Sequence, residues 1–425
     1  MATDEHLVNL PRIKDLDNPA FDLMSAERFV FGDKVDPHTP LAELRRRSPV
    51  WEGSYGQAVG DPDYPSFAEP GQREFLVLGY AEVSEAARDF EAFPNGPALQ
   101  KNLGVVFGNT ISLMDPPLHG RFRRIFQAAF LPKTLAQWGQ DIVTPVANEL
   151  LDKIVAANRC DLVEDFTRHY PFHVIYRQLA LPDAEAEIFH RLSVTQGLFG
   201  GGGELRERAL KAVAHLGEYF TAMAAERRAH PGTDLLSLIV QAEVDGERLS
   251  DELIVSFMRQ LINAAGETTF HGTSNLLAAL LTHPGQLEAV RRDRSLVPQA
   301  VEEALRWESP TALQMRFVAK DVTLGGTFMP AGSMAVLCLG VANRDEKIFP
   351  NPDQFDIFRH KTRHFGFGFG PHICIGQHLA RIEMHGALDA TLDRLPGLRL
   401  DPTKPPPAII GSNLRHPRHI HVVFD

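Results

Sequence analysis

The glycine-rich segment HFGFGFGPHICIG, residues 364–376, leads to a single cysteine, Cys374, and then to a sequence typical of a helix. A thiolate at the start of a helix is stabilised by backbone N–H groups and by the positive end of the helix dipole. Such a sulfur can ligate a metal or a haem iron, act as a nucleophile, or pack in the core. Gly368, Gly370 and Gly376 would allow close backbone approach and positive φ angles.

A second candidate segment, NAAGETT at residues 263–269, places the acid Glu267 directly before Thr268. A glycine and two threonines are poor choices for a helix interior. The segment therefore predicts either a close helix crossing or a local distortion of the helix hydrogen bonds. A carboxylate beside hydroxyl groups on a buried helix could also relay protons. The residues alone favour none of these interpretations.

Long helices and a minor sheet must position these residues. One helix begins at Ser250, a typical N-cap, and repeats apolar residues every four positions as far as Pro284. Glu303 and Arg306 share a face of another helix. We expect a mainly α chain with a minor β-sheet region, forming one continuous unit over residues 1–425. Its β-rich parts are predicted at about 20–112 and 310–365, and its helical parts at 113–310 and 375–395.

Composition excludes several classes of function. The chain of 425 residues is 44% hydrophobic, and its formal net charge of −11 disfavours nucleic-acid binding. The three cysteines, Cys160, Cys338 and Cys374, form no CxxC pair, so neither a disulfide framework nor a structural zinc site is expected. The N-terminus lacks a signal peptide and no segment is long enough to span a membrane. A cytoplasmic protein without a membrane anchor is therefore predicted.

The order of these segments along the chain resembles the order of motifs in a known family. The AAGETT segment is followed by E-x-x-R at Glu303 and Arg306, and then by F-G-x-G-x-H-x-C-x-G at residues 367–376. This set resembles the cytochrome P-450 family of haem-thiolate monooxygenases, in its soluble bacterial form, over nearly the whole chain. The resemblance implies the cytochrome P-450 fold in a single haem domain, and an oxidoreductase that hydroxylates its substrate.

The resemblance also implies a cofactor site for haem b. Cys374 would be the axial ligand of the iron, whose electron density the thiolate raises. Phe367 would shield the sulfur, while Gly368 and Gly376 would let the porphyrin approach. The haem propionates would be held by a set of basic residues: His119, Arg123, Arg316 and His372.

In the resembled family, Glu267 and Thr268 are the catalytic pair. Thr268 would hold dioxygen and a water molecule by hydrogen bonds, and Glu267 would relay protons from solvent. This chain departs from the common A-G-x-[D/E]-T pattern, because Ala265 takes the glycine position and Gly266 the variable one. The Glu303–Arg306 pair, joined by Arg359, would hold the cysteine loop.

A lipophilic substrate such as a terpenoid, a steroid or an aromatic compound follows from the apolar segments that correspond to the family's pocket. The residues predicted to line the pocket are Asn263, Gly266, Phe107, Leu313 and Ile410, with Leu198 and Ile262 among further apolar candidates. Asn263 is either an anchor for a substrate hydroxyl or ketone, or hydrogen-bonded to a neighbouring helix. Gly200–Gly203 is either a surface linker or a hinge.

Electrons must come from another protein, because the sequence contains no nucleotide-binding motif. The resemblance implies a ferredoxin with its ferredoxin reductase, docking on a basic face with Arg121, Arg124 and Arg363 as candidates. Two alternatives remain open: a peroxygenase that does not use dioxygen, and a non-catalytic haem sensor or carrier. The Glu267–Thr268 pair favours the oxygenase over both.

Overall fold

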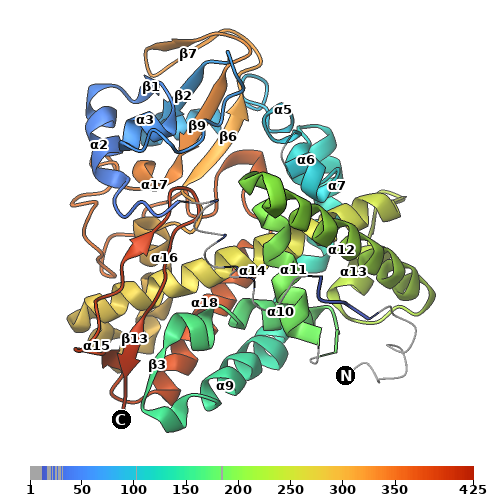
Figure 1. The fold of residues 1–425 in the computed structure, drawn as a ribbon, viewed down its shortest axis with the longest axis vertical. Helices are drawn as coiled ribbons and strands as arrows, with labels where there is room; N and C mark the ends of the chain where they lie inside the picture. Colours follow the sequence, from blue (N-terminus) through green and yellow to red (C-terminus); the bar gives the residue numbers. More distant parts are fainter. Residues whose placement is uncertain are drawn as a thin grey trace.

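The computed structural model describes residues 12–16, 21, 23, 26, 30, 32–101, 103–182 and 185–425. Its helices surround one long central helix, and a small sheet lies at one end of the molecule (Figure 1). The α-helices are α2 (His38–Arg47), α3 (Tyr55–Val59), α4 (Tyr80–Ala86), α5 (Gly96–Leu99), α6 (Leu103–Phe107), α7 (Leu118–Gln127), α8 (Pro132–Trp138), α9 (Thr144–Asp152), α10 (Tyr170–Gln178), α11 (Ala186–Gly197), α12 (Gly203–Ala229), α13 (Leu235–Gln241), α14 (Asp251–Thr282), α15 (Pro284–Arg292), α16 (Val297–Trp307), α17 (Leu339–Ala342) and α18 (Gln377–Arg394).

The strands form small sheets. The largest has the order β1 (Val50–Glu52), β2 (Glu74–Val77), β9 (Met334–Cys338) and β6 (Leu313–Phe317). Strand β9 pairs parallel with β2 and antiparallel with β6. The remaining pairings join β10 (Arg399–Leu400), β13 (His421–Val423) and β3 (Arg159–Asp161) in one sheet, β11 (Ile409–Ile410) with β12 (His416–Pro417), β4 (Glu243–Val244) with β5 (Glu247–Arg248), and β7 (Val322–Leu324) with β8 (Thr327–Met329).

The central helix α14 begins as the sequence predicts. The Ser250 side chain accepts a hydrogen bond from the backbone N–H of Leu253, which satisfies one of the free donors of the first turn. The helix runs for 32 residues without interruption, so the predicted distortion at NAAGETT is not present. The close crossing predicted as the alternative is present instead. A Cβ atom on Gly266 would lie 2.3 Å from the ring of Phe172 on α10.

Two hydrophobic clusters meet along α14. Leu253, Ile254 and Phe257 from its first half pack with α7, α8 and α10–α13, whereas Leu276 and Leu280 from its second half pack with α9, α15, α16 and α18. The helix is therefore fixed over its full length by buried apolar contacts, each worth roughly 1.5–3 kcal/mol for a fully buried side chain. This gives the residues of its middle a rigid frame.

The predicted mainly α fold with a minor sheet is confirmed. The region 113–310 is less purely helical than expected, because strand β3 and the β4–β5 hairpin lie within it. Strand β3 is short and pairs with β13 at the end of the chain, so no local repeat of apolar residues marks it. Within the described residues, no helix has the combination of length and apolar character that crossing a bilayer requires.

Candidate haem and oxygen-activation site

The cysteine loop is a tight hairpin closed by its own backbone. The N–H of Cys374 donates to the carbonyl of Phe367 at 2.9 Å. Gly368 and Gly370 adopt positive φ angles of 70° and 72°, which glycine adopts without strain. Gly370 is also required for steric reasons, since a Cβ atom there would lie 2.1 Å from the carbonyl oxygen of Ala87. The loop thus packs against the end of α4.

Cys374 lies at the N-terminus of α18, which begins at Gln377, two residues later than expected. Burial raises the pKa of the Cys374 thiol, whereas backbone N–H groups of Gly376 and Gln377 lower it. The guanidinium groups of Arg123 and Arg381 also lower it. The thiol nevertheless remains accessible to solvent. Protein therefore surrounds the sulfur on several sides and leaves one side open to a ligand.

The expectation for Gly376 requires correction. Its φ angle is −86°, so it does not use the left-handed region. A Cβ atom there would lie 4.0 Å from the sulfur of Cys374, which is ordinary contact. The ring of Phe367 packs under the guanidinium of Arg381, 4.3 Å from the ring centroid. Sequence spacing alone does not determine which backbone angle each glycine of the loop adopts.

The four predicted basic residues form one cluster. His119 on α7 and His372 in the cysteine loop lie ring against ring, with their centroids 4.1 Å apart. Arg123, one turn after His119, donates to the loop backbone at 2.6 Å. Burial, with the charges of His372 and Arg123, lowers the pKa of His119 to about 4. Arg316 on β6 is only 3% exposed, and burial lowers its pKa to about 10.

This cluster is suited to a group that carries carboxylates. Asp115 is its nearby acid, and the buried Nε2 atom of His372 lies 3.8 Å from it, beyond hydrogen-bond distance. A buried polar atom without a partner is costly, as is a buried cation such as the guanidinium of Arg316 without a directly bonded anion. The two propionates of haem would complete the hydrogen bonds of such a donor set. The residues present therefore fit haem, with Cys374 as the thiolate ligand.

Glu267 and Thr268 lie in the middle of α14. Glu267 is 5% exposed, and its Oε2 atom accepts a hydrogen bond of 3.1 Å from the side chain of Asn263. The hydroxyl of Thr268 donates to the carbonyl of Ala264 at 2.6 Å. Ala264 is exposed although it lies mid-way along a buried helix. This side of α14 therefore faces open space, whereas Gly266 faces α10.

The residues predicted to line the substrate pocket lie on different elements and are buried to different extents. Gly266 contacts Phe172 and serves the helix crossing, so the structure places it against α10. Asn263 also donates to the carbonyl of Ser193 on α11 at 3.2 Å, which is the helix-to-helix role held as the alternative. Phe107 is buried beside α12, Leu313 is buried in the core of the larger sheet, and Ile410 is half-buried on β11. Leu198 and Ile262 are completely buried in the core and do not line a pocket.

The predicted Glu303–Arg306–Arg359 cluster forms. Arg306 donates to both carboxylate oxygens of Glu303 at 2.8 and 2.7 Å, and Arg359 adds a contact at 3.2 Å. The cluster holds residues 343–354 directly, through three backbone carbonyls that accept from Arg306. It reaches the cysteine loop through Asn343, whose side chain accepts the N–H of Phe365 at 2.7 Å.

Sequence reasoning missed the ion pair that holds the cysteine loop more directly. Glu302 on α16 accepts hydrogen bonds from Arg381 on α18 at 2.6 and 3.1 Å, and His364 lies 3.3 Å away. Although burial opposes it, these partners lower the pKa of Glu302 to about 2. The two consecutive glutamates, Glu302 and Glu303, could have indicated this ion pair in the sequence, since each of them pairs with a different arginine.

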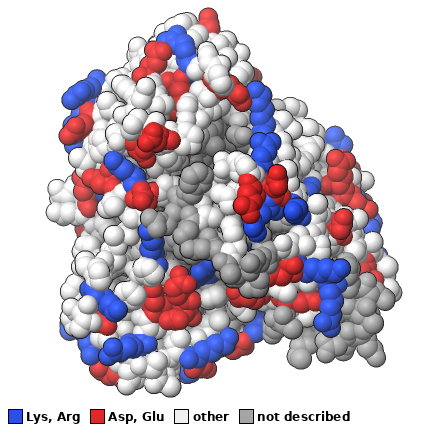
Figure 2. Space-filling model, viewed as in Figure 1, with Lys and Arg blue, Asp and Glu red and all other residues white. Residues whose placement is uncertain are grey.

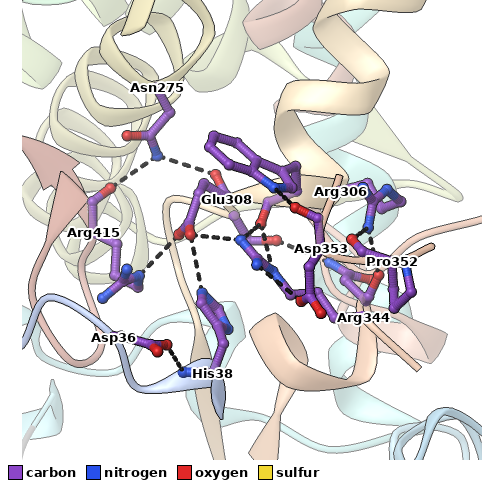
Figure 3. A network of polar contacts seen from close by, with 12 residues as sticks. Asp36, His38, Asn275, Arg306, Glu308, Arg344, Pro352, Asp353 and Arg415 are labelled. Atoms are coloured by element: carbon purple, nitrogen blue, oxygen red, sulfur yellow. Dashed lines mark hydrogen bonds and ion pairs between the residues drawn. The ribbon is translucent and has the colours of Figure 1, made fainter. Parts of the chain in front are cut away.

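A second missed network surrounds Glu308, which follows α16 (Figure 3). Its carboxylate contacts His38 at 3.0 Å, Arg344 at 2.7 Å and Arg415 at 2.9 Å. All four side chains are buried. The arginines hold the pKa of Glu308 well below its usual range against the effect of burial. The partners come from the beginning, the middle and the end of the chain, so no short motif could reveal them.

The predicted redox-partner residues are only partly available. Arg121 pairs with Glu247, and Arg124 with Asp245 at 3.4 Å, so the β4–β5 hairpin opposes the charge of α7. Arg363 instead lies against the ring of Phe369 in the cysteine loop, 4.2 Å from its centroid, together with Arg88 at 4.6 Å. On the face shown in Figure 2, cations and anions of the described residues are interspersed.

Comparison with known proteins gives consistent matches. A family model described as cytochrome P450 matches residues 186–423, more than half of the chain. Cytochrome P450 107B1 of Saccharopolyspora erythraea is 36% identical over 305 residues, covering 72% of this chain and 73% of that protein. A methyl-branched lipid omega-hydroxylase of Mycobacterium tuberculosis is 35% identical over 370 residues, 84% of each chain. The structure of CYP109E1 from Bacillus megaterium in complex with testosterone matches with a TM-score of 0.80 at 29% identity, covering 92% of this chain and 99% of that one.

Proposed function

Because this chain belongs to the cytochrome P450 family of haem-thiolate monooxygenases, we propose that it hydroxylates a lipophilic small molecule with electrons from a separate ferredoxin. The observation that carries the proposal is the position of Cys374. Its sulfur lies at the start of α18, receives the N–H groups of Gly376 and Gln377, and remains open on one side. This sulfur would hold haem b, which would supply dioxygen activation and C–H oxidation when bound.

We assign the binding of the cofactor to the basic cluster. Arg123, Arg316, His119 and His372 would hold the propionates, and Arg381 would keep negative charge on the sulfur through its contact with the loop. Burial makes these charges more effective, because the surrounding protein screens them less than water does. The protein's part here is to orient the cofactor and to exclude water from the thiolate.

Thr268 and Glu267 are assigned to proton delivery. The Thr268 hydroxyl now donates to the Ala264 carbonyl, and rotation about its side-chain bond would let it donate toward the open side of α14. Glu267 is held by Asn263 one turn away, so its carboxylate keeps one orientation. A positioned carboxylate can pass protons from water to the threonine. This pair favours an oxygenase over a peroxygenase or a haem carrier, neither of which needs it.

The substrate is proposed to be a lipid or a steroid. Two similar proteins support this class: one is named a methyl-branched lipid omega-hydroxylase, and the other was crystallised with testosterone. Aromatic and terpenoid compounds belong to the same screen.

The electron donor is proposed to be a ferredoxin reduced by its own reductase. Arg88 and Arg363 beside the cysteine loop, with Arg121 and Arg124 on α7, would attract an acidic partner. The free cysteines of the chain fit a reducing cytoplasm, where such a donor is found.

The test begins with the holoenzyme. Its reduced carbon-monoxide complex should show the red-shifted band of a thiolate ligand, and Cys374→Ser should lose that band. Steroids and branched fatty acids should then be screened for a shift from low to high spin. Turnover should need both reduced ferredoxin and oxygen. Equal turnover with peroxide alone would favour the peroxygenase, and absence of turnover with every donor would favour the carrier.

A further inference from the structure

Three potential metal ligands converge at the small sheet near the C-terminus, apart from the residues assigned to haem and substrate (Figure 1). Asp161 ends β3, and His421 begins β13 directly opposite it in the antiparallel register. His419 lies two residues before His421, and side chains two residues apart along an extended segment point to the same side. The sequence RHIH therefore directs both imidazoles toward one carboxylate.

The carboxylate is held ready for a ligand. Its Oδ1 atom accepts the backbone N–H of Ile420 at 2.9 Å and of Val163 at 3.1 Å. These bonds fix the orientation of Asp161 and leave Oδ2 toward the imidazoles. The Nδ1 atom of His419 lies 2.6 Å from Oδ2, and that of His421 lies 3.8 Å from it. The ring planes are nearly parallel, at 9°.

We propose that Asp161, His419 and His421 bind a zinc ion. Zinc–nitrogen and zinc–oxygen bonds of about 2.1 Å in a tetrahedral site place ligand atoms roughly 3.4 Å apart. The two separations from Oδ2, 2.6 and 3.8 Å, lie on either side of that value, so small side-chain rotations suffice. Two imidazoles with one carboxylate suit zinc, whereas calcium and magnesium prefer oxygen ligands. His419 is 57% exposed, which leaves the fourth position to water.

A second group of three, His169, Glu187 and His190, is less suited to a metal. His190 is buried and stacks on the ring of Phe172, with centroids 3.9 Å apart. The Nε2 atom of His169 already contacts the carbonyl of Glu164 at 3.0 Å, and its ring is perpendicular to that of His190. These contacts explain the two imidazoles as packed side chains.

Zinc at the first group would join two distant parts of the chain. Strand β3 follows α9, and β13 lies at the end of the sequence, so the ion would cross-link the last strand to the helical part. A ligand that binds only the folded state raises the melting temperature as its concentration increases. The site is thus proposed to stabilise the C-terminal strand rather than to take part in oxidation.

The experiment uses the haem-loaded full-length chain without a polyhistidine tag. Zinc chloride is titrated by calorimetry, and bound zinc is measured after dialysis. We expect one zinc ion per chain and a melting temperature that rises with zinc concentration. His419→Ala, His421→Ala and Asp161→Asn should each weaken binding by about tenfold or more. The asparagine keeps an oxygen for the two backbone N–H groups, so folding should be retained.

The matched control is His230→Ala, because His230 is also 57% exposed and also contacts an acid, Glu226, at 3.0 Å. This variant should bind zinc like the parent protein, as should His169→Ala from the second group. Equal binding by all variants would identify an adventitious ion only and overturn the proposal. Loss of binding in His169→Ala alone, or no stoichiometric binding by the parent protein, would also overturn it.

Discussion

At the scale of single residues, Asn263 has the most informative position. Its amide donates to Ser193 on α11 and to Glu267 one turn further along α14. We therefore expect the side chain to hold the proposed proton relay rather than to anchor a substrate. A hydrogen bond of this kind, to a carboxylate, is worth at least about 1 kcal/mol net, which corresponds to a change of about fivefold or more in an equilibrium.

Asn263→Leu tests that role. The leucine cannot donate to Glu267, so protons should be delivered less reliably, and the fraction of electrons that reach product should fall by about fivefold, in line with one lost hydrogen bond. The measurement is product and hydrogen peroxide formed per reduced cofactor consumed. The dissociation constant from the substrate spin shift should stay within about twofold, in contrast to the larger loss expected of a substrate anchor.

Thr268→Ala is the reference for complete loss of the proposed proton delivery through Glu267 and Thr268. It should give more hydrogen peroxide than Asn263→Leu. Unchanged coupling together with weakened substrate binding in Asn263→Leu would instead show that the asparagine contacts the substrate.

At the scale of elements, the β4–β5 hairpin lies against α7 and pairs with the basic residues proposed for ferredoxin docking. These pairs are exposed, with Arg121 57% and Arg124 61% accessible, so each contributes little to stability. Their effect on a charged partner is larger, because they set the local field. The hairpin is therefore expected to weaken docking.

The double variant Asp245→Asn with Glu247→Gln tests this effect. It removes two negative charges beside Arg121 and Arg124, so the KM for an acidic ferredoxin should fall by about two- to fivefold at low ionic strength. At high salt the difference should disappear, because mobile ions screen exposed charges. The control Glu243→Gln removes a charge of the same hairpin that pairs with Arg248 instead. An equal effect in the control would assign the change to net charge alone.

The crossing of α10 and α14 depends on one glycine. Gly266→Ala would place a methyl group 2.3 Å from the Phe172 ring, so the helices must separate. We expect a loss of about 1–3 kcal/mol in the free energy of unfolding, measured by chemical denaturation. Gly285→Ala on α15 is the control, because nothing lies within 4 Å of its added methyl group. It should be neutral or stabilise by up to about 1 kcal/mol. Equal effects at both positions would contradict the crossing.

Sequence patterns predicted the elements whose causes are local. The Ser250 cap, the apolar repeat of α14 and the glycine turns between β6 and β9 act within a few residues, so they could be read directly. Strand β3 could not, because its partner β13 lies at the other end of the chain. The same reason applies to Gly266, whose neighbour Phe172 lies on another helix. The sequence shows that a glycine is needed, but not whether a backbone angle or a neighbouring ring requires it.

At the scale of the whole molecule, Glu308 joins three distant regions through His38, Arg344 and Arg415 (Figure 3). Burial, with the charge of Arg344, lowers the pKa of His38 to about 4, compared with 6.5 in the unfolded chain. The unfolded state therefore binds a proton between these pH values that the folded state does not. Stability contributed by neutral His38 is complete above pH 6.5 and is lost as the pH falls toward 4.

The free energy of unfolding should therefore decrease from pH 6.5 to 4. Each such histidine contributes a slope of at most about 1.4 kcal/mol per pH unit. His38→Gln can still donate a hydrogen bond to Glu308 but does not titrate. The slope of the free energy of unfolding against pH should therefore fall by the contribution of one bound proton. Denaturant titrations at several pH values measure this. An unchanged slope would show that other groups, such as His416, account for the acid sensitivity.

Removal of the carboxylate should have a larger effect. Glu308→Gln leaves the buried guanidinium group of Arg415 without its anion and leaves Arg344 with only the exposed carboxylate of Asp353. Breaking a buried pair in this way costs about 3–5 kcal/mol. Denaturation at pH 7 measures the loss. Glu346→Gln is the control, because Glu346 also pairs with arginine but is 42% exposed, and its loss should cost about 1 kcal/mol or less. Similar losses in the two variants would contradict the importance of burial.

The pairing of β2 with β9 has a consequence for synthesis on the ribosome. Strand β2 ends at Val77, whereas its parallel neighbour β9 begins only at Met334. At a translation rate of about 5–20 residues per second, β9 is synthesised roughly 13–50 seconds after β2, and β2 lacks this partner during that time. During this interval an unpaired edge is exposed to other nascent chains. Growth at a lower temperature, which slows translation, should therefore increase aggregation before the haem can be inserted. Overexpression should have the same effect, because more chains with an unpaired β2 edge are present at one time.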